Sequence, residues 1–132
     1  MDSTVSFKIP AKREFVGLVR LAVGGLSQVT SFDVDTVEDL KLVMSEICTS
    51  MINSSPDEDT DMSFSFRLDK SELTIEIDSI EAVNELVSAT SSEWSEATHD
   101  KYGLSIIMAL MDKVELVSDG KGHSVLRLKK FF

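Results

Sequence analysis

Thr36–Ser54 reads TVEDLKLVMSEICTSMINS, and it is the longest strongly periodic stretch of this chain. Apolar residues recur in it every three or four positions, which is the spacing of a helix with one buried stripe. The stripe consists of Val37, Leu40, Met44, Ile47 and Met51. Asp35 or Thr36 is expected to cap the start of this helix, and Pro56 to end it. The stretch therefore predicts a long amphipathic helix that packs against the core.

A second face of the same helix carries polar side chains. Glu46, Ser50 and Asn53 stand at positions i, i+4 and i+7, so they line up away from the buried stripe. A carboxylate and an amide oxygen are suitable ligands for Mg²⁺, and a positioned carboxylate can serve as a general base. The face could therefore hold a cation-bound phosphate or aim a base, although a solvated helix face has the same pattern.

The length and charge of the chain limit what it can be. At 132 residues, with 42% of them hydrophobic, it supports a single domain over residues 1–132 with a real core. The formal net charge is −10 and is spread along the chain, which disfavours direct binding to nucleic acid. Such a surface suits a protein partner with a basic face, but solubility alone would explain the acidity equally well.

Location and cysteine chemistry are also restricted. The chain has no apolar run of about 18 residues and no charged-then-apolar leader, so the protein is expected in the cytoplasm and not in a membrane. Cys48 is the single cysteine, which rules out an internal disulfide. Its place next to Ile47 predicts a small core residue.

The other periodic stretches complete an α+β pattern. Alternating residues predict strands at 4–9, 62–68, 73–77, 114–117 and 124–128. Helical spacing predicts helices at 11–26, 81–89 and 102–111. Short turns join the second strand to the third and the fourth to the fifth, which makes two hairpins. The order of elements predicts an α+β two-layer sandwich, in which helices cover one face of a mixed β-sheet.

Three segments together resemble a known family. They are SEICTSMINSS at 45–55, KYGLSIIMALMDKVEL at 101–116 and DGKGHSVLRLKK at 119–130. The chain is similar, over nearly its whole length, to the anti-sigma-factor serine kinases of the sporulation and general-stress type. These are small members of the Bergerat-fold, histidine-kinase-like ATPase superfamily. The resemblance implies that fold, a homodimer, and ATP or ADP with Mg²⁺ as the ligand.

The resemblance also assigns roles on the central helix. In the family this helix carries a Glu that acts as catalytic base, then an Asn that holds Mg²⁺ on the phosphates, and then usually a His. The matching positions here are Glu46, Ser50 and Ser54. The acid is kept, whereas the metal position is a hydroxyl and the third position is a serine. Asn53 lies one turn beyond Ser50 and offers an amide close to the metal position.

The nucleotide-binding boxes of the family are partly retained. After the third strand the family has Asp-x-Gly-x-Gly, whose Asp accepts a hydrogen bond from the adenine amino group. This chain has DSIEA at 78–82, so Asp78 matches the acid and the glycines are missing. A carboxylate at a strand end is also common in turns. At the start of the helix predicted at 102–111, free N–H groups would hold the phosphates, which implicates Gly103, Leu104 and Ser105.

The last family position lies just after the final hairpin turn, where a residue closes on the nucleotide. Gly122, His123 and Ser124 occupy this place, and Ser124 is the candidate. The resemblance further places partner-binding cations on the first helix, where Lys12, Arg13 and Arg20 could serve.

Three functions remain open on these observations. The favoured one is an anti-sigma factor that sequesters an RNA polymerase sigma factor, with weakened or lost nucleotide binding. The alternative is an active kinase, with Glu46 as base, that phosphorylates a STAS-type antagonist protein. The third is a small-molecule-sensing α+β domain unrelated to the ATPases, which would lose ground if Glu46 and Asp78 faced one shared pocket.

Overall fold

The computed structural model describes residues 2–54, 61–78, 99–118 and 124–132. The strands in these ranges are β1 (Ser3–Pro10), β2 (Asp61–Leu68), β3 (Glu72–Asp78), β4 (Lys113–Ser118) and β5 (Ser124–Phe131). The α-helices are α1 (Val16–Leu26), α2 (Val34–Ser54) and α4 (His99–Leu110), with 3-10 turns η1 (Arg13–Phe15) and η2 (Ser27–Val29). The helix predicted at 81–89 lies outside the described residues. None of the described helices combines the length and apolar character of a membrane span.

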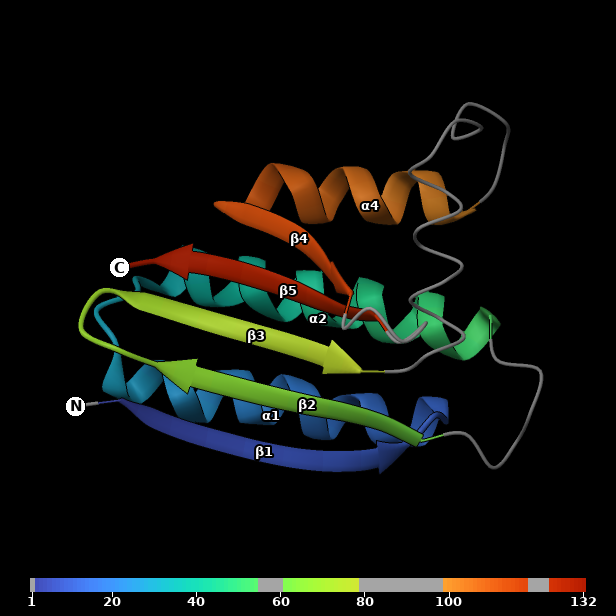
Figure 1. Ribbon diagram of the computed structural model, residues 1–132, viewed down its shortest axis with the longest axis horizontal. Coiled ribbons are helices and arrows are strands. Elements are labelled where there is room, and N and C mark those ends of the chain that lie inside the picture. The colour runs from blue at the N-terminus through green and yellow to red at the C-terminus, as the bar shows by residue number, and fades with distance from the viewer. Residues whose placement is uncertain (1, 55–60, 79–98, 119–123) are drawn as a thin grey trace.

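The strands form one sheet in the order β1-β2-β3-β5-β4 (Figure 1), and each neighbouring pair is antiparallel. The prediction of a mixed sheet is therefore wrong for the described part of the chain. Both α1 and α2 lie between β1 and β2, so the chain runs along the molecule twice before it returns beside β1. One helix between them would give a parallel neighbour, whereas two give an antiparallel one.

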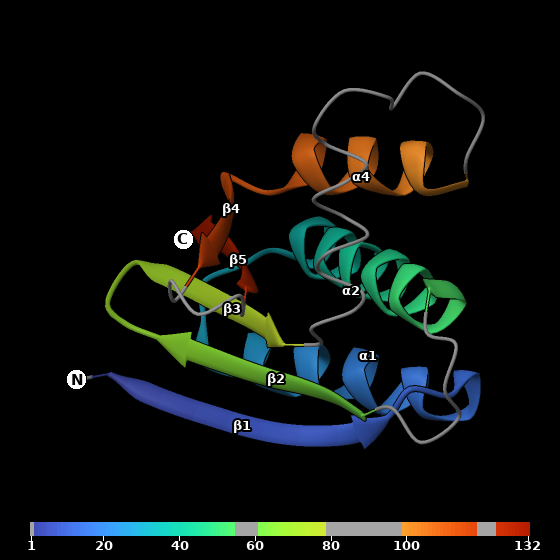
Figure 2. The same ribbon diagram turned by 45° about the vertical axis from the view of Figure 1, so that its right-hand side comes forward.

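The two-layer α+β architecture is confirmed. Helices α1 and α2 cover one face of the sheet, and α2 lies between α1 and α4 (Figure 2). The core fills the space between the layers with side chains of α2 and of alternate strand residues. Its largest fully buried members include Phe64, Phe66, Leu40, Met44, Ile47, Met51, Ile75, Ile77 and Leu128. The face of the sheet is buried because each strand places every second residue toward the helices.

The stripe predicted for α2 is largely confirmed, since Leu40 and Met51 are 1% exposed and the residues of the stripe between them are fully buried. Val37 is only half-buried. The predicted cap is wrong, because α2 begins at Val34 and the carboxylate of Asp33 accepts the Thr36 N–H at 2.8 Å. Several residues near this point can cap a helix, and the position of the first turn decides among them.

The open face of the sheet carries charged side chains from its central and edge strands. Arg127 on β5 lies 3.1 Å from Glu76 on β3 and 3.9 Å from Glu115 on β4. The Nζ of Lys129 lies 3.2 Å from a carboxylate oxygen of Glu72. These pairs connect three adjacent strands on the face opposite the helices, so the sheet has one apolar face and one charged face.

Candidate functional site

The polar face predicted for α2 is present. Glu46 and Ser50 are half-buried on neighbouring turns, and Asn53 is exposed one turn further on. The guanidinium of Arg13 donates a hydrogen bond from Nη2 to Oδ1 of Asn53 over 3.3 Å. The structure therefore brings the candidate base and the candidate metal position onto one face, while the Asn53 amide oxygen is engaged by a residue of η1.

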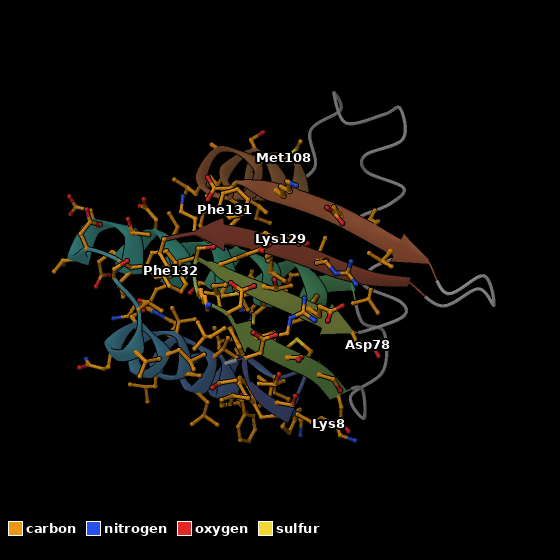
Figure 3. All side chains as sticks on the ribbon, turned by 60° about the vertical axis from the view of Figure 1, so that its left-hand side comes forward. Lys8, Asp78, Met108, Lys129, Phe131 and Phe132 are labelled. Carbon is orange, nitrogen blue, oxygen red and sulfur yellow. The ribbon has the colours of Figure 1, made fainter. Side chains whose placement is uncertain are left out.

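Asp78 is the last residue of β3 and lies on the opposite side of the sheet from α2. Its neighbour Ile77 is fully buried in the core under the helices. Successive side chains of a strand point to opposite faces, so the Asp78 carboxylate faces away from the helices. It lines an open groove of about 490 Å³ together with Lys8 of β1 and Glu76 of β3, and Figure 3 shows Lys8 and Asp78 near each other at this end of the sheet.

The two acids that the resemblance assigns to a nucleotide site are therefore separated by the sheet. Glu46 is not among the residues that line the Asp78 groove. On the face toward α2, the end of β3 presents the aliphatic side chain of Ile77. An adenine amino group on that side would meet an apolar side chain where a carboxylate acceptor is required.

The candidate phosphate-binding residues lie inside α4 and not at its start. The helix begins at His99, three residues before the predicted start, so Gly103 is its fifth residue. Only the first four N–H groups of an α-helix lack a partner within the helix. In a regular helix the N–H groups of Gly103, Leu104 and Ser105 are therefore already bonded to carbonyls of the preceding turn. Ser124 begins β5 and pairs with Ser118 of β4 in the sheet register.

Among the described residues there is no group of three or more His, Cys, Asp or Glu side chains that could hold a metal ion. At the position expected for Mg²⁺, α2 offers the hydroxyl of Ser50, which reaches less far than an amide. Taken with the placement of Asp78, the described residues do not fit a nucleotide held with Mg²⁺ in the way the resemblance implies.

A second groove, of about 920 Å³, lies between α1 and the first half of α2. Sequence reasoning missed it, because the groove follows the side of α1 that lies away from the buried residues Val19 and Val23. The signals that could have found it are the glycines of α1, at positions 17, 24 and 25, and the apolar Leu21 between them, which is exposed.

Comparison with known proteins decides the family. The model of the histidine kinase-like ATPase domain matches residues 9–130. The chain belongs to this family. The expectation drawn from the three sequence segments is thereby confirmed, as is the fold expected from it.

The curated relatives include two bacterial serine-protein kinases. One is the serine-protein kinase RsbW of Halalkalibacterium halodurans, 32% identical over 136 residues, which cover 97% of this chain and 83% of the relative. Another is RsbW of Bacillus cereus, 31% identical over 134 residues, 95% of this chain and 83% of the relative. The chain therefore spans most of the length of these kinases.

Among solved structures, a chain of the SiaB–SiaC complex from Pseudomonas aeruginosa has a similar fold. The TM-score is 0.65 over 97% of this chain and 88% of that one, at 10% sequence identity. At this identity the likeness concerns the fold alone. The family match also excludes the third function considered above, the small-molecule-sensing domain, because that function required a domain unrelated to the ATPases.

Proposed function

We propose that this protein is an anti-sigma regulatory factor that binds and sequesters an RNA polymerase sigma factor, and that its nucleotide binding is weakened or lost. The observation that carries the proposal is the placement of Ile77 and Asp78 at the end of β3. The fold of the family is intact, but the carboxylate suited to adenine lies on the far side of the sheet from Glu46. A protein-binding role needs the fold and its surface, whereas nucleotide binding needs that carboxylate.

The nucleotide part of the proposal is tested by calorimetric titration of the purified protein with ATP and with ADP in the presence of Mg²⁺. We expect no saturable heat, and no thermal stabilisation at millimolar nucleotide. The Asp78→Asn variant should behave like the unchanged protein, because its side chain faces the other groove. Micromolar binding that Asp78→Asn abolishes would contradict the proposal.

The sigma-factor part is tested by co-expressing the protein with each sigma factor of its host. A stable complex in size-exclusion chromatography, together with inhibition of transcription from promoters of that sigma factor, is the expected result. If the purified protein leaves transcription by every sigma factor unchanged, the anti-sigma function is wrong. The acidic surface supports this role, because the DNA-binding regions of a sigma factor are basic.

A second candidate is an active serine protein kinase. Two observations favour it: Glu46 is kept and half-buried on α2, and the curated relatives are named serine-protein kinases. In this function Glu46 would accept the proton of a substrate serine while ATP with Mg²⁺ supplies the phosphoryl group. The substrate would be a STAS-type antagonist of the anti-sigma factor. Transfer of labelled phosphate to such a protein, lost in Glu46→Ala, would establish this function and overturn the first.

We also propose, from the resemblance, that the protein acts in the cytoplasm as a homodimer. Light scattering at micromolar concentration tests the dimer directly. A monomer that still inhibits its sigma factor would remove the dimer from the proposal and leave the anti-sigma role standing.

A further inference from the structure

The open face of the sheet, which lies opposite the helices, carries a row of cations. The strand register places four residues side by side across neighbouring strands: Arg67 of β2, Thr74 of β3, Lys129 of β5 and Lys113 of β4. Lys129 lies near the middle of this face (Figure 3). None of these four positions holds an acid, although the net charge of the chain is −10. Arg67, Lys129 and Lys113 are called the cation row below.

Two members of the cation row oppose each other directly. Lys113 and Lys129 are cross-strand partners, and like charges at directly opposite positions destabilise a sheet. A lysine on an edge strand discourages pairing with another sheet, which accounts for Lys113 alone. It does not account for Lys129 opposite it, or for Arg67 on the interior strand β2. A local arrangement that opposes stability is typical of a functional surface.

The charges of the cation row are only partly balanced by the rest of the face. Lys129 pairs with Glu72 at 3.2 Å, and the glutamates of the neighbouring register row are held by Arg127. Arg67 and Lys113 are both exposed, and neither forms a hydrogen bond or ion pair with the part of the chain that the structure describes. The two ends of the cation row are therefore available for an anion.

The spacing of the two available cations selects the form of the occupant. Arg67 and Lys113 lie three strand spacings apart, which is about 14 Å. In an extended segment, side chains four residues apart point to the same side and lie about 13 Å apart. On one face of a helix, the side chains closest to this separation lie about 10 Å or about 16 Å apart. An extended segment with acids at every second position therefore matches the cation row best.

The surroundings of the cation row limit the kind of anion. A nucleic acid carries a phosphate at every residue, so it would meet the glutamates on both sides of the row, Glu72, Glu76 and Glu115, as well as the negative net charge. A protein segment can place its acids only opposite the cations. A second copy is less suited, because the glutamates of its own open face are already held by Lys129 and Arg127.

We propose that the cation row is a docking site for an extended acidic segment of a protein partner, which crosses the strands with carboxylates opposite Arg67, Lys129 and Lys113. The inference goes beyond the proposed function, because it holds whether or not the protein binds a sigma factor. The acids of the partner are confined to this segment, since the net charge of −10 disfavours a partner that is acidic overall.

The test follows the backbone amide signals of the isotope-labelled full-length protein in NMR spectra. The titrant is a short peptide with glutamate at every second position and threonine between. We expect saturable shifts of the amides along the cation row, and binding that weakens as salt is added. Arg67→Gln and Lys113→Gln should each weaken the peptide about twofold to fivefold, the range for one exposed ion pair.

Lys113→Glu separates binding from folding. It replaces two opposed lysines with an opposite-charge pair, so the melting temperature should be unchanged or higher. The same change repels a carboxylate of the peptide, so the peptide should bind about tenfold more weakly or worse. If Lys113 served the fold alone, Lys113→Glu would leave the affinity for the peptide unchanged, and that result would overturn the inference.

Two controls separate the cation row from general effects. Lys8→Gln makes the same change in net charge on the same face, but Lys8 opposes Ser63 toward the other end of β2 and lines the groove of Asp78. This variant should bind the acidic peptide like the unchanged protein. A peptide with glutamine in place of glutamate should not bind. Equal binding by the row variants, binding of the glutamine peptide, or no saturable shift at millimolar acidic peptide would overturn the inference.

Two further outcomes would assign the cation row to another occupant and would also overturn the inference. A single-stranded oligonucleotide that binds the row more tightly than the peptide would indicate nucleic acid. A dimer that dissociates in Lys113→Glu would indicate a second copy. The sigma-factor assay on Lys113→Glu keeps the two proposals apart, because unchanged sigma binding preserves the anti-sigma role even if the row binds no peptide.

Discussion

Cys48 lies in the core on the buried side of α2 and is fully shielded from solvent. Burial raises the pKa of its thiol to about 12, because the surroundings disfavour the charged thiolate. The prediction of a small core residue at this position is confirmed. A reactive role is opposed by both the burial and the raised pKa.

We therefore expect Cys48 to be inert toward a disulfide reagent such as Ellman's reagent in the native protein at pH 8. The thiol should react within seconds once the chain is unfolded in guanidinium, because it is then hydrated and its pKa returns to the ordinary range. Absorbance of the released thiolate measures both rates. Fast reaction of the native protein would mean that α2 opens readily from the sheet.

Asp33 is a second residue whose single side chain affects the stability of the fold. Hydrogen bonds from the Thr36 hydroxyl and from the Thr36 backbone N–H hold the pKa of its carboxyl below the ordinary value. Because the pKa is lower in the folded state than in the unfolded state, this cap stabilises the fold at pH values above the unfolded pKa. The contribution is lost as the pH falls through the folded pKa.

Replacing Asp33 with Ala should accordingly lower the midpoint of urea unfolding at pH 7, and the difference from the unchanged protein should shrink in acid. Asp35→Ala is the matched control, because Asp35 is an exposed acid in the first turn of α2 that does not bond the Thr36 N–H. Equal losses in both variants would show that the helix dipole, and not the cap, accounts for the effect.

At the scale of elements, α2 supplies the largest single contribution to the core. Its buried side chains pack against β2, β3 and β5, so the helix holds the two layers together. The same helix presents Glu46 and Ser50 on its other face. The polar face is therefore positioned by the burial of the apolar one, and a loosened α2 would displace both.

Ile47→Ala should lower the free energy of unfolding by about 2–5 kcal/mol, because it removes a fully buried side chain and leaves a cavity. Thr49→Ala on the exposed side of the same helix is the control and should change it by less than about 0.5 kcal/mol. Urea unfolding followed by circular dichroism measures both. A loss below about 1 kcal/mol for Ile47→Ala would mean that the core closes around the gap.

In strand β3 the side chains alternate, so neighbouring residues lie on opposite faces of the sheet. Ile77 is buried under the helices and Asp78 lines the groove on the open face. A match of residue types along the sequence assigned Asp78 to the nucleotide site. Successive side chains of a strand point to opposite faces, so a shift of one position along the sequence moves a functional group to the other side of the sheet.

At the scale of the whole molecule, Phe132 contacts two parts of the fold that are far apart in the sequence. Phe132 packs edge-on against Phe32, which precedes α2, with ring centroids 5.1 Å apart. The backbone N–H of Phe132 donates to the carbonyl of Ser71, in the turn between β2 and β3, at 2.8 Å. The end of the chain thus joins the sheet to the connection between α1 and α2, beside the groove that Phe32 also lines.

A double-mutant cycle on Phe32 and Phe132 should give a coupling energy of about 0.5–1.5 kcal/mol, the range for an aromatic pair beyond its buried area. Each Phe→Leu change alone should destabilise the protein, and the double variant by less than the sum. Chemical denaturation of the four proteins supplies the cycle. Strict additivity would mean that the two rings do not stabilise each other.

Much of the architecture was predictable from periodicity, because local spacing records which residues of an element face the core. The two hairpins, the first strand and the burial of Cys48 agree with their sequence patterns, whereas the helix predicted at 11–26 begins only at Val16, after the 3-10 turn η1, and the helix predicted at 36–54 begins two residues earlier, at Val34. The family was predictable from three segments that lie between residues 45 and 130. These properties depend on residues close together along the sequence or on the order of residue types.

The direction of the strands, the cap at Asp33, the face that Asp78 occupies and the groove along the α1 glycines were not predictable in this way. Each depends on how separate elements meet in space. The sequence alone determined the elements and their buried faces, because these follow from local conformational preference and from hydrophobic burial. Only the tertiary structure decided which polar groups share a surface, because that is set by the packing of α1, α2 and the sheet against one another.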